Sequence, residues 1–178
     1  MPHSSDRYQP KLCVRVARSV DADAARAVLR AGYAQYADAF APEAWRSYLE
    51  EIVDLEARAQ ASELVVATLD DRVVACVSYY PPGSGSRYEP HSFAVGWPDD
   101  WAAFRLLSVH PDARGRGIGR KLTEECISRA RVDGASAVGL HTTAVMAAAR
   151  TLYESMGFER VPNHDFYGGP GIQVDAYR

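Results

Sequence analysis

Cysteine is scarce in this sequence. Its 178 residues include three cysteines, Cys13, Cys76 and Cys126, which lie far apart and have apolar neighbours. An odd number at such spacing fits buried thiols better than a disulfide framework or a metal site. We therefore expect no metal and a reducing, cytoplasmic location.

Long apolar runs and a large charge of one sign are also missing. No apolar run approaches the roughly 20 residues that cross a bilayer, and the opening MPHSSDRYQPK lacks the apolar core of a signal peptide. The formal net charge of -3 gives no overall attraction to nucleic acid or to an anionic membrane. We expect neither as a partner, so anion recognition must be local.

Apolar residues, by contrast, make up 47% of the chain, enough for one good core. We expect a loose N-terminus over residues 1–10 and a single domain over residues 11–178. Strands are predicted over 12–17, 63–69, 73–80, 102–109, 136–142, 158–161 and 172–178, with a tight turn at Asp70-Asp71. Helices are predicted over 19–40, 42–57, 117–132 and 146–156. This order fits an α/β or α+β sheet with helices on both faces.

A glycine-rich turn, VHPDARGRGIGRKL over residues 109–122, lies between a strand and a helix. Such a turn presents backbone N–H groups at the positive end of the helix dipole, which favours phosphate. Its glycines permit unusual backbone angles, and its arginines can bond to phosphate oxygens. The G-x-G-x-G spacing fits neither the nucleotide-binding loop nor the dinucleotide fingerprint. Nucleic-acid binding through RGRGIGRK would need a broad basic face, which this acidic chain lacks.

The residues from Arg114 to Gly119, RGRGIG, match the R/Q-x-x-G-x-G/A signature of the GNAT superfamily of N-acetyltransferases. The longer stretch LLSVHPDARGRGIGRKL resembles the strand, loop and helix of that family, and AARTLYESMGFER over 148–160 resembles its second element. The resemblance implies a mixed, largely antiparallel sheet that splays at the strand before the loop. It also implies acyl transfer from acetyl-CoA, by direct transfer in a ternary complex, to a primary amine of a small molecule or a protein.

The resemblance also assigns roles to residues. The main chain of Leu107, Ser108 and Val109 would bond pantetheine and the thioester carbonyl. The pyrophosphate would lie against Arg114, Gly115, Arg116, Gly117, Ile118, Gly119 and Arg120. Tyr153 matches the tyrosine that protonates the departing thiolate in many relatives, a role that suits a phenol at neutral pH.

The sequence departs from the family pattern at the strand before the loop. Many relatives have a glutamate there that takes the proton of the amine through water, but WAAFRLLSV contains no acid. His141 has the most suitable intrinsic pKa for this base, although a lone histidine often only bonds to its neighbours. Four further candidates are Glu89, His91, Asp99 and Asp100.

Other assignments stay open at this level. Met146 stands where relatives often have an asparagine that contacts the cofactor. Tyr33 and Tyr80 are our candidates for the wall of an acceptor pocket, although such aromatics are often core residues. The missing strand acid leaves a second function open, an acyl-CoA-binding or sensing module with little turnover. The sequence leaves the oligomeric state open, with a homodimer as one option.

Overall fold

The computed structural model describes residues 10–84, 96–168 and 172–178. Its first half consists of β1 (Leu12–Val16), η1 (Ser19–Asp21), α1 (Ala22–Tyr33), η2 (Ala34–Ala39), α2 (Pro42–Val53), α3 (Leu55–Ala59), β2 (Glu63–Leu69) and β3 (Arg72–Tyr80). The second half consists of β4 (Trp101–Val109), η4 (Pro111–Ala113), α4 (Ile118–Val132), β5 (Ala137–Thr143), α5 (Ala147–Ser155), η5 (Pro162–His164), β6 (Phe166–Tyr167) and β7 (Gln173–Tyr177).

The strands form one sheet in the order β1-β2-β3-β4-β5-β7-β6. Only the β4–β5 pair among the described strands is parallel, and the other neighbours are antiparallel. The predicted mixed, largely antiparallel sheet is therefore confirmed. The predicted hairpin is confirmed too, because Asp70 and Asp71 have φ angles of 49° and 66°, as a tight turn between β2 and β3 requires.

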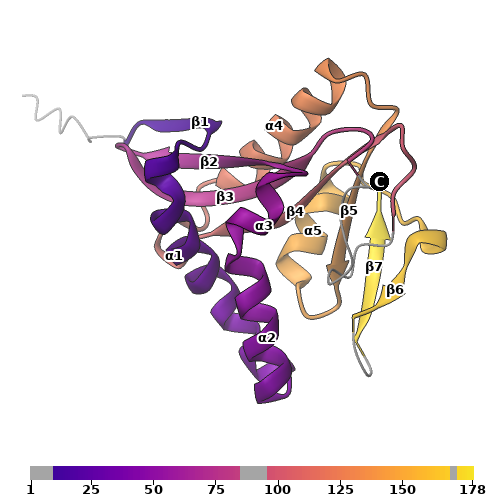
Figure 1. Ribbon diagram of the computed structural model, residues 1–178, viewed down its shortest axis with the longest axis horizontal. Coiled ribbons are helices and arrows are strands. Elements are labelled where there is room, and N and C mark those ends of the chain that lie inside the picture. Colours follow the sequence, from indigo (N-terminus) through magenta and orange to yellow (C-terminus); the bar gives the residue numbers. More distant parts are fainter. Residues whose placement is uncertain (1–9, 85–95, 169–171) are drawn as a thin grey trace, which may run out of the picture.

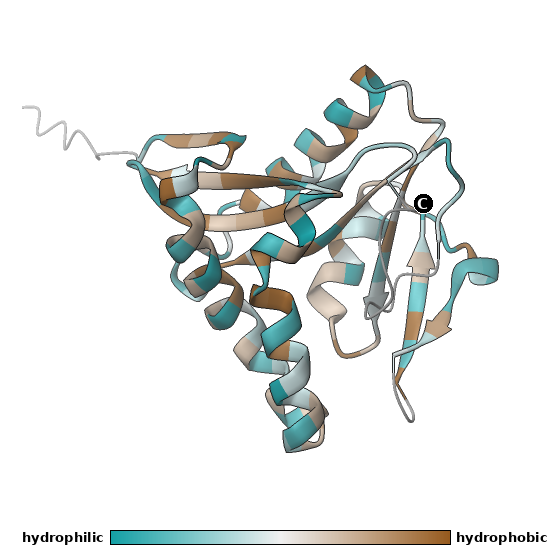
Figure 2. Ribbon diagram, in the orientation of Figure 1, coloured by the Kyte–Doolittle hydropathy of each residue, from teal (hydrophilic) through white to brown (hydrophobic). Residues whose placement is uncertain are grey.

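Helices cover both faces of this sheet (Figure 1). Successive strand residues point to opposite faces, so Val65 packs in one core cluster with Leu122 of α4, while Val66 packs in another with Leu29 of α1 and Ile52 of α2. Figure 2 shows the central strands largely brown, whereas the helices alternate brown and teal as half-exposed helices do. No helix in the described part of the chain is long and apolar enough to cross a membrane.

Three local predictions need correction. The helix predicted over 42–57 breaks at Asp54, whose side chain caps α3 by accepting from the Ala57 N–H at 3.0 Å. The strand predicted over 158–161 is reduced to an isolated bridge between Arg160 and Tyr177, because Pro162 begins a 3-10 turn directly after it.

The third correction concerns the cysteines. Cys76 and Cys126 are buried, as expected, but Cys13 is exposed because it lies on the edge strand β1.

Candidate active site

Strand β4 contains a bulge at Leu106, in the middle of the sheet. Its pairing with β3 shifts register between Cys76 and Ser78, and Leu106 has a φ of 56°. An inserted residue breaks the ladder and bends the strand, and such a backbone angle costs about 1 to 3 kcal/mol in a non-glycine residue. Backbone strain of this kind is characteristic of functional sites, so the bulge marks a candidate site.

Beside the bulge, β4 separates from its parallel neighbour β5. Their described pairing ends at Ala103 opposite Gly139, although β4 continues to Val109 and β5 to Thr143. The two strands therefore diverge at the end that leads into the glycine-rich turn. This is the splayed sheet that the sequence resemblance implies.

Helix α1 packs unusually close to β4 next to the bulge. A Cβ at Gly32 would lie 2.0 Å from the Ser108 Oγ, so a larger residue there would clash with Ser108 as it is placed. The Ser108 hydroxyl donates to the Val28 carbonyl at 3.0 Å, which fixes the helix against the strand. The Ser108 side chain therefore holds α1 against β4.

The glycine-rich turn has the backbone that its sequence predicts. Gly115 and Gly117 have φ angles of 73° and 71°, and Gly117 is the N-cap residue of α4. No described atom lies within 4 Å of the place where a Cβ would stand at either residue. The first N–H groups of α4 have no partner within the helix and carry the positive end of its dipole. The turn is thus an open cradle for an anion.

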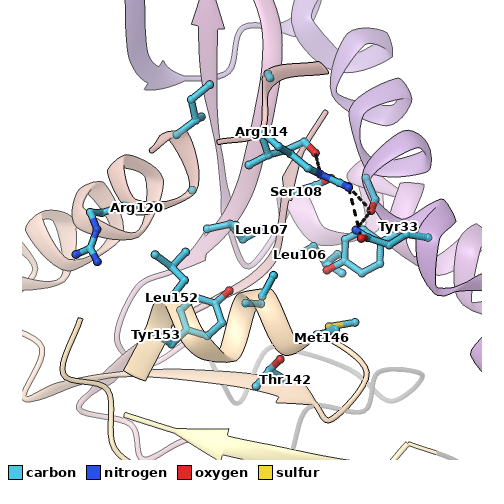
Figure 3. Close-up of a pocket in the computed structure, with 18 of the residues that line it drawn as sticks. Tyr33, Leu106, Leu107, Ser108, Arg114, Arg120, Thr142, Met146, Leu152 and Tyr153 are labelled. Carbon is cyan, nitrogen blue, oxygen red and sulfur yellow. Dashed lines mark hydrogen bonds between the residues drawn. The ribbon is translucent and has the colours of Figure 1, made fainter. Parts of the chain in front are cut away.

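Arg114 uses its guanidinium within the protein. Its Nη2 donates to the Gly32 carbonyl at 3.1 Å and its Nε donates to the Val109 carbonyl at 3.3 Å. These bonds fasten the turn to α1 and to the end of β4. In this structure the side chain of Arg114 therefore shapes the turn, as Figure 3 shows.

The other two arginines of the turn differ in position. Arg120 donates from Nη2 to the Ser155 hydroxyl of α5 at 2.8 Å and lines the cavity described next. Arg116 is exposed and does not line that cavity.

A cavity of about 430 Å³ lies between the bulge, the turn and α5, and we call it the turn cavity (Figure 3). Of the residues that the resemblance assigns to the cofactor, those lining it are Leu107 to Val109, Arg114, Gly115 and Gly117 to Arg120. Their backbone and basic groups suit a phosphate at one end. Leu107 and Leu152 supply apolar surface beside Gly119, where a Cβ would lie 3.6 and 3.4 Å from their Cδ2 atoms.

A second cavity of about 620 Å³ lies between α2, β4 and the C-terminal strands, and we call it the α2 cavity. Its residues are mostly apolar and aromatic, as in small-molecule sites. The two cavities share Tyr33, Leu106, His141, Thr142 and Met146. They therefore meet at the bulge.

Tyr153 lies on α5 and lines the turn cavity. Its ring packs edge-on against Phe104 and Phe158, with centroids 5.7 and 5.8 Å away. Figure 3 shows its hydroxyl directed into the space between α5 and β4. Burial raises the pKa of Tyr153, so the phenol keeps its proton at neutral pH.

His141 lies at the junction of the cavities in an aromatic setting. Its ring stacks on Trp97 with centroids 4.4 Å apart, and its Nε2 lies 3.0 Å from the His164 carbonyl. Burial lowers its pKa to about 4, so the imidazole is neutral at neutral pH. If Nε2 carries the ring proton and donates to this carbonyl, Nδ1 is left as the acceptor.

The remaining predicted side chains lie in different places. Tyr33 lines both cavities, whereas Tyr80 is buried and lines neither. Asp100 accepts a hydrogen bond from the Ser136 hydroxyl at 2.6 Å, and neither it nor Asp99 lines a described cavity. Glu89 and His91 fall outside the described residues.

The sequence profile of the Acetyltransferase (GNAT) family matches residues 28–158. The chain belongs to this family. The match includes the β4 bulge, the glycine-rich turn and Tyr153, which together line the turn cavity.

Curated relatives carry acetyltransferase names. The chain is 31% identical over 137 residues to the probable N-acetyltransferase camello of Xenopus tropicalis, covering 75% of this chain and 57% of that protein. It is 43% identical over 74 residues to the N-acetylaspartate synthetase of Danio rerio, covering 42% of this chain and 26% of the relative. The matched part thus spans about a quarter of that synthetase.

Solved structures share the fold. The PaiA N-acetyltransferase of Thermoplasma acidophilum, in complex with coenzyme A, superposes with a TM-score of 0.70 at 15% identity, covering 93% of this chain and 98% of that one. A GNAT family acetyltransferase of Brucella melitensis, in complex with acetyl-CoA, has a TM-score of 0.60 at 23% identity and covers 93% and 88%.

Several lining residues of this GNAT chain could not be predicted from the sequence, and three of them carry polar or charged side chains that matter below. Gln35 lines the turn cavity, and Glu51 and Arg105 line the α2 cavity. Glu51 lies on α2 and Arg105 on β4, 54 positions apart in the sequence, and no local motif links them. No group of three or more His, Cys, Asp or Glu residues in the described ranges is arranged to hold a metal ion.

Proposed function

We propose that the chain catalyses acetyl transfer from acetyl-CoA to a primary amine of a small molecule or protein, directly in a ternary complex. The observation that carries the proposal is the bulge at Leu106 beside the diverging strands, which opens a cavity from the glycine-rich turn to Tyr153. Pyrophosphate, pantetheine and thioester would follow one another along this cavity.

The residues fit this cofactor in two ways. The left-handed Gly115 and Gly117, with open space before them, leave room for phosphate oxygens at the N-terminus of α4. The apolar side chains of Leu107 and Leu152 suit the pantetheine arm. A backbone N–H of residues 107–109 directed at the thioester oxygen would stabilise its developing charge, an effect worth about 3 to 4 kcal/mol.

Tyr153 would supply the proton that the leaving group needs. The acceptor nitrogen forms a bond to the carbonyl carbon, the C–S bond breaks, and the Tyr153 hydroxyl gives its proton to the thiolate sulfur. The nitrogen releases one proton to a base, and the phenol regains one proton at the end of the cycle, so the protons balance. The raised pKa of Tyr153 suits a group that must carry its proton when the reaction begins.

His141 remains our candidate for the group that accepts the proton of the amine. It lines both cavities, and at neutral pH its imidazole is neutral and can accept a proton. Because a pKa of about 4 makes His141 a weak base, it would accept the proton once the bond from nitrogen to the carbonyl carbon is forming and the nitrogen has become more acidic.

Calorimetric titration tests the binding part of the proposal. We expect CoA to bind and ATP and NAD to bind far more weakly. Thiol release from acetyl-CoA is then measured with and without a panel of primary amines. Amine-dependent release supports the enzyme, CoA binding without release favours the sensing module, and no CoA binding contradicts both.

A further inference from the structure

The α2 cavity contains one pair of oppositely charged side chains in a wall that is otherwise mostly apolar and aromatic. Glu51, in the last turn of α2, and Arg105, directly before the bulge of β4, both line it. Glu51 Oε1 lies 3.5 Å from Arg105 Nη2, and the side chains are 24% and 16% exposed. They are the only Asp, Glu, Lys or Arg residues among the described residues that line this cavity.

The backbone of Glu51 is held in place, yet the ion pair with Arg105 leaves its Oε1 without a hydrogen bond. Arg58 donates from Nη1 and Nη2 to the carbonyls of Glu51 and Ile52, each at 2.7 Å, which fixes the end of α2. Glu51 Oε1 is buried and accepts no hydrogen bond from any described residue. A buried acceptor without a donor costs about 1 to 3 kcal/mol, more when charged. The negative end of the helix dipole adds to this cost.

Two further acceptors in the same cavity share this property. The Oγ1 atoms of Thr142 and Thr143 on β5 are buried without a hydrogen-bond partner among the described residues. Both residues line the α2 cavity, and Thr142 also lines the turn cavity. Buried polar groups are almost always paired, and a hydroxyl can donate or accept, so these oxygens point to a ligand with polar groups.

The rest of the wall is suited to an apolar group. Phe40 and Tyr48 stack with centroids 5.5 Å apart, and Met146 and Ile172 line the same cavity. A volume of about 620 Å³ is within the usual range for small-molecule sites.

We propose that the α2 cavity binds an α-amino carboxylate with an apolar side chain as the acceptor, with its carboxylate on Arg105 and its amine at Glu51. This inference rests on the proposed function and names its substrate class. An α-amino acid carries opposite charges on one carbon, which matches protein charges 3.5 Å apart. Because Arg105 directly precedes Leu106, where the two cavities meet, an acceptor bound to Arg105 would lie beside the proposed thioester site.

The competing reading is that the pair only fastens α2 to β4. A panel of matched acceptors separates the two readings: phenylalanine against phenethylamine and phenylalaninamide, and leucine against isoamylamine. We expect kcat/KM to be about 10- to 100-fold higher for the acids, the range of one charge-assisted hydrogen-bonded contact. Equal values for each acid and its decarboxylated amine overturn the proposal.

Substitutions at Arg105 and Glu51 test whether these two residues cause the preference for the amino acid over the amine. Arg105→Gln is expected to bring the ratio of acid to amine toward one, and Glu51→Gln to raise the KM of the amino acid about tenfold or more. The matched controls are Arg46→Gln and Glu50→Gln, exposed positions on α2 that do not line the cavity. A purely structural pair would instead lower the melting temperature and reduce the rates of acids and amines alike, which also overturns the proposal.

A binding measurement keeps this test separate from that of the proposed function. Phenylalanine and phenethylamine are titrated calorimetrically into the CoA-bound protein. Preferential binding of phenylalanine, lost in Arg105→Gln, supports the inference even without turnover. Equal or absent binding of both overturns it while leaving CoA binding intact. Failure of CoA itself to bind contradicts the proposed function.

Discussion

Tyr153 is the residue whose environment most directly favours one chemical role. It is buried against the rings of Phe104 and Phe158, and burial raises its pKa. It also lines the cavity that begins at the glycine-rich turn. Tyr153→Phe removes one oxygen and keeps the packing. We expect kcat to fall about 100-fold or more, as for loss of a general acid, with the Kd of CoA nearly unchanged.

Steady-state rates and calorimetry check this prediction. Tyr167→Phe is the control, because Tyr167 is 72% exposed and lines neither described cavity. An unchanged kcat in Tyr153→Phe rejects the acid role.

His141 should make stability depend on pH. Its folded pKa of about 4 lies below the ordinary 6.5, so the unfolded chain binds more protons between these values. The contribution of His141 to the free energy of unfolding is therefore fully present above pH 6.5. It is lost as the pH falls toward 4, which lowers the free energy of unfolding by up to about 3 kcal/mol.

Urea unfolding at pH 4.5, 5.5, 6.5 and 7.5 measures this loss. His141→Gln should show a shallower decrease with falling pH than the unchanged protein. His110→Gln, at a partly exposed residue that lines neither cavity, should keep the original slope. Identical slopes for all three proteins would refute the assignment to His141.

At the scale of elements, the approach of α1 to β4 depends on Gly32. Gly32→Ala places a Cβ 2.0 Å from the Ser108 Oγ, so either this hydroxyl rotates and loses its bond to the Val28 carbonyl, or α1 and the strand separate. Overpacking of this kind typically costs about 1 to 3 kcal/mol of unfolding free energy. Because Gly32 also lines the turn cavity, CoA affinity should fall as well.

The double variant Gly32→Ala/Ser108→Ala provides the control. Removing the Ser108 hydroxyl leaves the nearest contact at 3.3 Å, from the Ser108 Cβ, so part of the lost stability should return. Urea unfolding of both variants measures this coupling. A double variant less stable than Gly32→Ala would contradict the proposed clash.

The glycine-rich turn and the start of α4 allow a second test at the scale of elements, because their arginines differ in position relative to the turn cavity. Arg120 lines the turn cavity and Arg116 does not. Arg120→Gln should weaken CoA binding by roughly tenfold, as for one charge-assisted bond, and lower its salt dependence. Calorimetry at two salt concentrations should show a much smaller effect for Arg116→Gln. Equal effects would place the pyrophosphate elsewhere.

At the scale of the whole molecule, the sequence predicted those features that depend on neighbouring residues alone. The Asp70-Asp71 turn and the glycines at 115 and 117 have the backbone angles that their sequences require. Contacts between distant segments were not predictable in this way. The register shift at Leu106 follows from the pairing of β4 with β3, and Glu51 meets Arg105 only after α2 folds across the sheet. Every residue of β3 from Val73 to Tyr80 is buried, so the side of the sheet on which Tyr80 lies could not be assigned without that register.

The central claim is that this GNAT-family chain moves an acetyl group from CoA to an amine within one cleft. Mass spectrometry of a reaction with acetyl-CoA and the amine panel tests it most directly. We expect one acetylated amine for each CoA released, with both products strongly reduced in Tyr153→Phe. CoA released without an acetylated amine, or no product with any amine, would contradict it.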